Sequence, residues 1–239
     1  MPESFLVSKT IAMKPCQELE DAAQSLFAAS CAVAVCSHET QALLNPQEEL
    51  LVQGAVDKRK REFGAGRHAA RACLAQLGVQ GEPVLLKGEK REVLWPEAYV
   101  GAISHRPPCS VAVAAQKAQF RSLGLDIEKR GRVEAKLWRL IFVESELAWL
   151  RSQDAEQGLE NATLLFSAKE SLYKLQFPLS HEYVDFRQAR LEHRGSHLAA
   201  WLPESIHERF AIKAPIEVGF AFTRDFVVSA CSLARDATP

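Results

Sequence analysis

The segment that constrains the fold most is Leu123-Gly124-Leu125-Asp126-Ile127-Glu128, an apolar run that ends in two acids. Alternate residues of a β-strand point to the same face, so an extended segment over residues 122–128 presents Asp126 and Glu128 side by side. Adjacent carboxylates repel each other, and a divalent cation between them removes that repulsion. An oxygen-only site with room for water and phosphate oxygens suits Mg²⁺ better than zinc. The segment therefore predicts a strand with a magnesium site, although two such acids are also typical of the polar face of an edge strand.

A second pattern, Lys169-Glu170-Ser171-Leu172-Tyr173-Lys174, lies where apolar residues recur at helical intervals. The spacing predicts a helix over residues 161–176, with Asn161 in the cap region and an end before Pro178. The apolar side of this helix consists of Leu164, Leu165, Ala168, Leu172 and Leu175.

Glu170 and Lys174 are four residues apart on one face of that helix. Such a pair is also common on solvent-exposed helices, where it contributes little. In the functional interpretation, Glu170 supplies a metal oxygen or contacts a substrate hydroxyl, and a lysine meets a phosphate as a point charge. Only one helix face can serve this site, so Lys174 is preferred over Lys169.

Short apolar runs and turn residues predict the remaining elements. They are a buried strand over residues 31–36, a largely helical region over residues 47–77, a short helix over residues 144–151, and two hairpins, formed by residues 110–115 with 123–128 and by residues 218–222 with 226–233. A weak likeness between residues 110–115 and 227–232 suggests two halves. We place them at residues 1–120 and 121–239, tightly packed as one unit.

The composition of the 239 residues is typical of a soluble globular protein, with 47% hydrophobic and 25% charged residues. A formal net charge of -1 gives no general attraction to nucleic acid or acidic membranes. Polar residues interrupt the richest early apolar stretch, residues 22–36, so we expect neither a signal peptide nor a membrane span, and a cytoplasmic location. The six cysteines lack a C-x-x-C pair or zinc spacing, which favours reduced cysteines that mostly pack in the core.

Basic residues gather near Lys58-Arg59-Lys60-Arg61, within the predicted helical region. Such a run is usually a solvated helix face and less often a nucleic-acid site. Arg67 and Arg71 continue the helix, and the set could hold a phosphate monoester. The segment Gly64-Ala65-Gly66-Arg67-His68-Ala69 has the spacing G-x-G-x-x-A, but the residues before it read as helix rather than strand. We therefore reject a dinucleotide-binding fingerprint.

Ser104-His105 follows Gly101-Ala102-Ile103 at a predicted strand edge or turn. A hydroxyl and an imidazole at such a position could bind an anion. No G-x-S-x-G surrounds Ser104, so this serine is not the nucleophile elbow of a hydrolase.

Four segments, taken in order, resemble the 4'-phosphopantetheinyl transferase superfamily, in the group of Sfp-like and enterobactin-type enzymes. They are residues 58–67, Ile103-Ser104-His105, Gly124-Leu125-Asp126-Ile127-Glu128 and residues 166–174. The last two match the family's Gly-x-Asp-x-Glu strand and its Trp-x-x-Lys-Glu-(Ala/Ser)-x-x-Lys helix, with Phe166 in place of the usual Trp. A further stretch keeps the family's Arg91 and Trp95-Pro96 but lacks its first proline.

The resemblance implies an α+β fold of two similar α/β halves related by a pseudo-twofold, with coenzyme A in the cleft between them. It implies an enzyme of the holo-[acyl-carrier-protein] synthase type, which moves the 4'-phosphopantetheine arm of coenzyme A to a serine of an apo acyl or peptidyl carrier protein. The reaction would depend on Mg²⁺ and release 3',5'-ADP. The expected partners are coenzyme A and such carriers, in fatty-acid or siderophore biosynthesis, without nucleic acid or membrane, and a monomer is preferred.

The resemblance also assigns roles to individual residues. Asp126, Glu128 and Glu170 would hold the magnesium, with Glu170 also as general base, directly or through water, and Lys174 on the diphosphate. The expected coenzyme A contacts are Lys58, Arg59, Arg61, Arg67, Arg91, Ser104, His105 and Lys174. Two alternatives stay open: a non-catalytic coenzyme A or nucleotide-binding module, and a Mg²⁺-dependent phosphohydrolase that uses the same ligands with water as the nucleophile.

Overall fold

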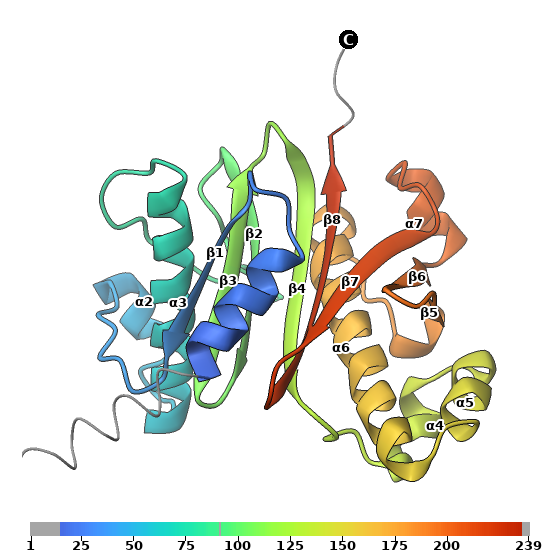
Figure 1. Ribbon diagram of the computed structural model, residues 1–239. Helices are drawn as coiled ribbons and strands as arrows, with labels where there is room; N and C mark the ends of the chain where they lie inside the picture. Colours follow the sequence, from blue (N-terminus) through green and yellow to red (C-terminus); the bar gives the residue numbers. More distant parts are fainter. Residues whose placement is uncertain (1–14, 91, 236–239) are drawn as a thin grey trace, which may run out of the picture. The chain divides into compact units, whose positions relative to one another are not determined.

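The computed structural model describes residues 15–90 and 92–235 (Figure 1). Helices and antiparallel strands both contribute to it, and the predicted α+β class is confirmed. These residues form two compact units, one that contains residues 15–90, 92–121 and Arg235, and a second that contains Ser122–Ala234. No helix within the described ranges is both long and apolar enough to span a membrane.

The first unit is built on a three-stranded antiparallel sheet in the order β1-β3-β2. Its strands are β1 Ala32–Ser37, β2 Tyr99–Arg106 and β3 Cys109–Gln116. All residues of the central strand β3 are buried except Gln116. The strand predicted over residues 31–36 is confirmed as β1, whereas β2 had been expected only as a strand edge or turn.

Helix α3, Asp57–Gln76, packs against this sheet. Ala65 and Ala69 are among the α3 residues in the shared core. At Gly66, an added Cβ atom would lie 3.1 Å from Ile103 Cγ2, so small residues let the helix approach the sheet closely. The G-x-G-x-x-A spacing therefore serves helix packing, and the residues before it are helical, as predicted.

The region predicted to be largely helical, residues 47–77, consists of two helices. Helix α2, Pro46–Leu50, comes first and is separated from α3 by the turns of residues 51–55. Asn45 precedes α2 and closes a capping box with Glu48. The cap defines a short separate helix, which apolar periodicity alone did not reveal.

The second unit is built on a five-stranded sheet in the order β4-β8-β7-β6-β5 (Figure 1). Its strands are β4 Phe120–Lys129, whose first two residues belong to the first unit, β5 Arg190–His193, β6 His197–Trp201, β7 Ile216–Phe222 and β8 Phe226–Ala234. The hairpin predicted at the C-terminal end is confirmed, because β7 and β8 pair antiparallel. The hairpin predicted for residues 110–115 and 123–128 was wrong, because β3 and β4 belong to different sheets. Strand β4 pairs with β8, a partner that lies far along the chain.

Helix α6, Ala155–Ser180, packs against β8 and β7 in this unit. The shorter helices are α4 Trp138–Ile141, α5 Glu144–Arg151 and α7 Glu204–Arg209, with the 3-10 turns η1 Ala135–Leu137 and η2 Phe186–Gln188. The helix predicted over residues 144–151 is confirmed as α5. Leu164 and Leu172 of α6 share one core with Leu198 of β6 and Val218 of β7.

The bounds predicted for the long helix were wrong at both ends. Helix α6 begins directly after Asp154, whose side chain caps it, and Asn161 lies inside the helix. It continues through Pro178, and His181 ends it in a left-handed conformation with φ 54°. Proline removes one backbone donor, but packing of the long buried face outweighs that loss in the last turn.

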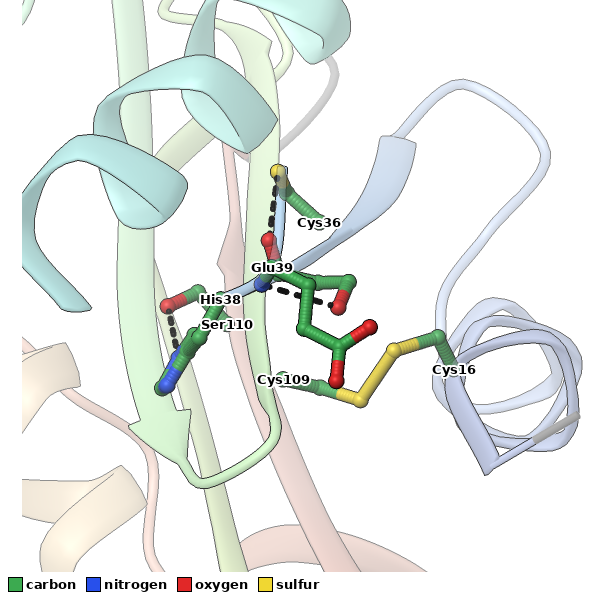
Figure 2. The surroundings of a disulfide bond; sticks show 7 residues. Cys16, Cys36, His38, Glu39, Cys109 and Ser110 are labelled. Atoms are coloured by element: carbon green, nitrogen blue, oxygen red, sulfur yellow. Dashed lines mark hydrogen bonds between the residues drawn. A yellow bond between two sulfur atoms is a disulfide. The ribbon is translucent and has the colours of Figure 1, made fainter. Parts of the chain in front are cut away.

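The six cysteines are not all reduced, which corrects the prediction. Cys16, in the helical residues 15–25, forms a disulfide with Cys109 at the start of β3, with a Cα–Cα distance of 6.0 Å (Figure 2). The two residues are 93 positions apart, so local spacing could not indicate the pair. The other four, Cys31, Cys36, Cys73 and Cys231, are free and buried, as expected.

Candidate functional site

The face of β4 that carries the acids points toward helix α6. Ser122 Oγ donates to the Leu175 carbonyl oxygen at 2.5 Å, which places this face of β4 against α6. Alternation along the strand then puts Gly124, Asp126 and Glu128 on the same face. The structure therefore holds the two carboxylates on one side of one strand, as alternation predicts.

Gly124 has a steric reason for its place in the Gly-x-Asp-x-Glu pattern. A Cβ atom at this position would lie 2.1 Å from the Ser171 carbonyl oxygen and 2.7 Å from Cys231 Sγ. The backbone of α6 would have to move away from β4 to accept it. The glycine thus sets the distance at which the side chains of α6 meet the acids.

We expect Gly124→Ala to lower the free energy of unfolding by about 1–3 kcal/mol, because the added methyl group overpacks a buried helix–strand contact. Gly54→Ala is the matched control, since no atom lies within 4 Å of a Cβ atom built there. Urea denaturation followed by circular dichroism measures both variants. Equal stability of the two would contradict the close approach of α6 to β4.

Asp126 and Lys174 form an ion pair between β4 and α6. The Lys174 ammonium lies 2.8 Å from Asp126 Oδ1 and also donates to the Leu125 carbonyl oxygen at 3.0 Å. The Asp126 side chain is 6% exposed, whereas that of Lys174 is 24% exposed. The carboxylate is thus nearly buried, while the ammonium borders solvent and stays accessible to an anionic ligand.

Glu128 is the second buried acid of β4. Its side chain is 2% exposed, and Oε2 lies 2.7 Å from the guanidinium NH1 of Arg132, which is 43% exposed. The same guanidinium lies 5.7 Å from the centre of the Phe166 ring. Sequence reasoning missed Arg132. The run of basic residues directly after the acids could have indicated that one of them pairs with an acid.

Glu170 lies on α6 directly before Ser171, the residue that meets Gly124 of β4. The strand and the helix run in opposite directions, since successive residues on the face of β4 meet Leu175 and then Ser171. The next residues on this face of β4 are the two acids, so they lie level with the turns of α6 that precede Ser171. Glu170 is half-buried there, one turn from Lys174.

Within residues 15–90 and 92–235, no three His, Cys, Asp or Glu side chains lie close enough together to hold a metal ion. The expected ligands Asp126, Glu128 and Glu170 are therefore not assembled as one group. The two carboxylates of β4 nevertheless fit Mg²⁺, which often takes one or two protein carboxylates and completes its octahedron with water and substrate phosphates. Metal binding at these oxygens competes with Lys174 and Arg132 for the same carboxylates.

Lys169, the alternative to Lys174 as a phosphate ligand, is buried. Its side chain is 1% exposed, and its ammonium lies 2.9 Å from Glu146 Oε2. Burial lowers the pKa of Lys169, and Glu146 acts in the opposite direction. Of the two lysines, only Lys174 is placed to meet a ligand.

In the first unit, the basic end of α3 meets β2. Arg59 NH1 lies 2.7 Å from His105 Nε2 and has only donors, so this nitrogen accepts and the imidazole is neutral in this arrangement. Glu62 Oε2 lies 3.6 Å from Arg59 NH1 and 3.4 Å from His105 Nε2. The second of these contacts is not an ion pair while Arg59 donates to the same nitrogen. The structure thus brings together Arg59 and His105. Ser104, the preceding residue of β2, is buried and faces the opposite side of the strand.

The other basic residues of the predicted site differ in their surroundings. Lys58 and Arg61 are exposed on α3. Arg67 is 4% exposed, its Nε donates to the Leu85 carbonyl oxygen at 2.7 Å, and burial lowers its pKa to about 10. Arg91 lies outside the described residues. Arg67 therefore has a structural contact that the sequence did not indicate.

His38, which sequence reasoning missed, lies near this cluster. Its Nε2 is 3.0 Å from Ser110 Oγ (Figure 2), and Ser110 is the β3 partner of His105. Burial lowers the pKa of His38, and the nearby Glu62 carboxylate acts in the opposite direction. The histidine thus supports the strand pair that carries His105.

Comparison with known proteins places both units in one family. The sequence model of the 4'-phosphopantetheinyl transferase N-terminal domain matches residues 47–115, in the first unit. The model of the 4'-phosphopantetheinyl transferase superfamily matches residues 122–231, in the second unit. The two matches together cover well over half of the 239 residues, and the chain belongs to the 4'-phosphopantetheinyl transferase superfamily.

Individual relatives agree with this assignment. The chain is 36% identical over 148 residues to the 4'-phosphopantetheinyl transferase Npt of Nocardia iowensis, a match that covers 62% of this chain and 65% of that protein. It is 37% identical over 150 residues to the 4'-phosphopantetheinyl transferase Svp of Streptomyces mobaraensis, with 62% and 61% covered. Enterobactin synthase component D of Escherichia coli K12 is 36% identical over 128 residues, with 52% and 57% covered. The chain thus matches less than two thirds of the length of each of these relatives.

Among solved structures, the holo-(acyl-carrier-protein) synthase of Bacillus anthracis matches with a TM-score of 0.40 and 17% sequence identity, over 50% of this chain and 100% of that one. The holo-[acyl-carrier-protein] synthase of Thermotoga maritima matches with a TM-score of 0.39 and 17% identity, over 48% and 63%. Likenesses of this size add nothing to the family assignment.

Proposed function

We propose that this protein transfers the 4'-phosphopantetheine arm of coenzyme A to a serine of an apo acyl or peptidyl carrier protein and releases 3',5'-ADP in a Mg²⁺-dependent reaction. The observation that carries the proposal is the buried acid pair of β4 with Lys174 beside it, within the region that the superfamily model matches. Phosphoryl transfer needs mainly positioning and charge stabilisation. Acids and an ammonium on a rigid strand and helix suit that task.

In this proposal, the carboxylates of Asp126 and Glu128 hold the metal. Bound Mg²⁺ supplies charge neutralisation at the coenzyme A diphosphate. Lys174 turns its ammonium from Asp126 to a diphosphate oxygen, where it acts as a point charge. Arg132, which reaches Glu128 from a mostly solvated position, gives way to the ligand in the same manner.

Glu170 is the proposed general base. It accepts the proton of the carrier serine, directly or through a water molecule. As the serine oxygen bonds to the phosphorus, the bond from that phosphorus to the bridging oxygen of the diphosphate breaks, and this oxygen leaves as part of 3',5'-ADP.

In the first unit, we assign the phosphates of the nucleotide part of coenzyme A to Arg59 and His105. A phosphate competes with Glu62 for Arg59, and His105, when it is protonated, adds a second donor and a positive charge. The exposed Lys58 and Arg61 add positive charge nearby, whereas Ser104 faces the opposite side of β2 from His105 and is left out. Arg67 is left out of this assignment because its Nε already donates to a backbone carbonyl.

Intact-mass spectrometry tests the proposed function. The full chain is incubated with Mg²⁺, coenzyme A and a panel of apo carrier proteins, some acyl and some peptidyl. We expect at least one carrier to gain the mass of the 4'-phosphopantetheine arm, with one equivalent of 3',5'-ADP in the supernatant. A carrier in which the target serine is replaced by Ala is the control and stays unmodified.

Two outcomes would contradict the proposal in different ways. Free phosphate without a modified carrier would identify a Mg²⁺-dependent phosphohydrolase that uses water as the nucleophile. Coenzyme A binding without either product, across the panel, would identify a binding module.

A further inference from the structure

The second unit contains a buried ion pair that the proposed chemistry does not use. Lys169 lies on α6, next to Glu170 in the sequence, and its ammonium contacts three oxygen atoms. These are Glu146 Oε2 at 2.9 Å and the carbonyl oxygens of Phe186 at 2.7 Å and Ala189 at 2.6 Å. A lysine ammonium has three N–H donors, so the protein satisfies all of them.

Glu146 is equally well satisfied. It is 2% exposed, and its carboxylate accepts from the backbone N–H of Leu191 at 2.7 Å and from that of Val143 at 2.9 Å. The pair therefore ties α6 to the first turn of α5 and to the start of β5. Three elements of the second unit meet at one buried charge pair.

Stability alone is a weak reason for such a pair. Burial of two charges is costly, and a well-packed apolar pair of similar volume is often as stable or more stable. What an apolar pair lacks is a fixed geometry, because dispersion contacts tolerate small rotations and shifts. A fully hydrogen-bonded ammonium in a buried site tolerates neither.

Because Lys169 lies on α6, the fixed geometry of the pair also constrains the orientation of this helix. Residues 169, 170 and 171 point in directions about 100° apart around the helix axis. On the face next to β4, Gly124 leaves room for the Ser171 backbone, and Lys174 reaches Asp126. Lys169 is anchored on another face, between α5 and β5. The helix is thus held from two sides, and Glu170 lies between the two anchors.

We infer that Lys169, through its buried pair with Glu146, is a positioning residue that fixes the rotation and axial position of α6 and so holds Glu170 and Lys174 in register with the acids of β4. This inference rests on the proposed function, in which Glu170 and Lys174 act on the substrate. Lys169 itself contacts neither the carrier nor coenzyme A.

The test uses Lys169→Met alone and the double variant Glu146→Gln with Lys169→Met. The single variant leaves the Glu146 carboxylate buried without its cation, which threatens folding. The double variant is neutral, and its glutamine keeps a carbonyl oxygen for one of the two backbone donors, which contact different oxygens of Glu146. We therefore expect it to fold with lower stability than the wild-type protein. Leu198→Ala is the matched control: Leu198 is fully buried in the same core, and its truncation lowers the melting temperature without touching the pair.

We expect the folded double variant to lose about 10- to 100-fold in kcat, the usual result of a small misplacement of reacting groups, with KM for coenzyme A little changed. Leu198→Ala, assayed at a temperature where it is folded, keeps the wild-type kcat despite its lower melting temperature. Lys169→Arg, which keeps a buried charge, recovers part of the lost kcat.

The double variant with wild-type kcat would overturn the inference, and so would a loss of kcat in Leu198→Ala as large as that in the double variant. Both results presuppose a wild-type protein that transfers the arm. If the wild-type protein modifies no carrier, the proposed function itself fails, and the inference fails with it.

Discussion

Glu170→Gln lowers kcat by about 10²- to 10⁴-fold while the affinity for coenzyme A changes little, because a general base acts on the serine proton in the transition state and adds little to ground-state binding. Glutamine keeps the size and the polarity of the side chain but cannot accept a proton from the serine. Single-turnover transfer to an apo carrier gives the rate, and isothermal titration with coenzyme A gives the affinity.

Glu156→Gln is the matched control, because Glu156 also lies on α6 but is exposed in its first turn, far along the helix from Glu170. The control keeps both the rate and the affinity. Equal losses of rate and affinity in Glu170→Gln would remove Glu170 from the role of base and leave it as a binding residue.

Asp126→Ala abolishes Mg²⁺-dependent transfer and leaves the protein folded. Loss of the metal removes several kcal/mol of transition-state stabilisation, which corresponds to about a thousandfold in rate or more. The protein tolerates the change because the ammonium left behind, that of Lys174, already borders solvent. Steady-state kinetics over a Mg²⁺ titration measures the rate, and circular dichroism establishes the fold.

Glu134→Ala serves as the control for this second variant, since Glu134 is an exposed acid paired with Lys136 and such surface pairs contribute little. Its activity stays at the wild-type level at every Mg²⁺ concentration. Full activity of Asp126→Ala under the same conditions would rule out a metal site on β4.

The elements that arise from short sequence patterns were predicted correctly. The alternation in residues 122–128 identified β4 and the common face of its acids, and the β7–β8 hairpin and α5 followed from short apolar runs between turns. The wrong predictions concern residues whose partners are far away in the sequence. Strand β4 pairs with β8 rather than with the strand before it, and Cys16 finds Cys109 across 93 residues. No periodicity within a short segment encodes such choices.

The residues of the candidate site also fall into those that local patterns predicted and those that they did not. Helical phase favoured Lys174 over Lys169, and the structure places Lys174 against Asp126 and buries Lys169. Glu146 and Arg132 were not predicted, because their roles follow from which elements pack together. Gly124 was recognised only as part of a family pattern, and its reason, contact with the backbone of α6, is visible only in three dimensions.

The most direct test of a metal site on β4 is a crystal of this protein grown with coenzyme A and Mn²⁺, a substitute for Mg²⁺ with a measurable anomalous signal. We expect one anomalous peak within bonding distance of carboxylate oxygens of Asp126 and Glu128 and of a diphosphate oxygen of coenzyme A. Coenzyme A bound with its diphosphate away from β4, and no anomalous peak at these carboxylates, would contradict it.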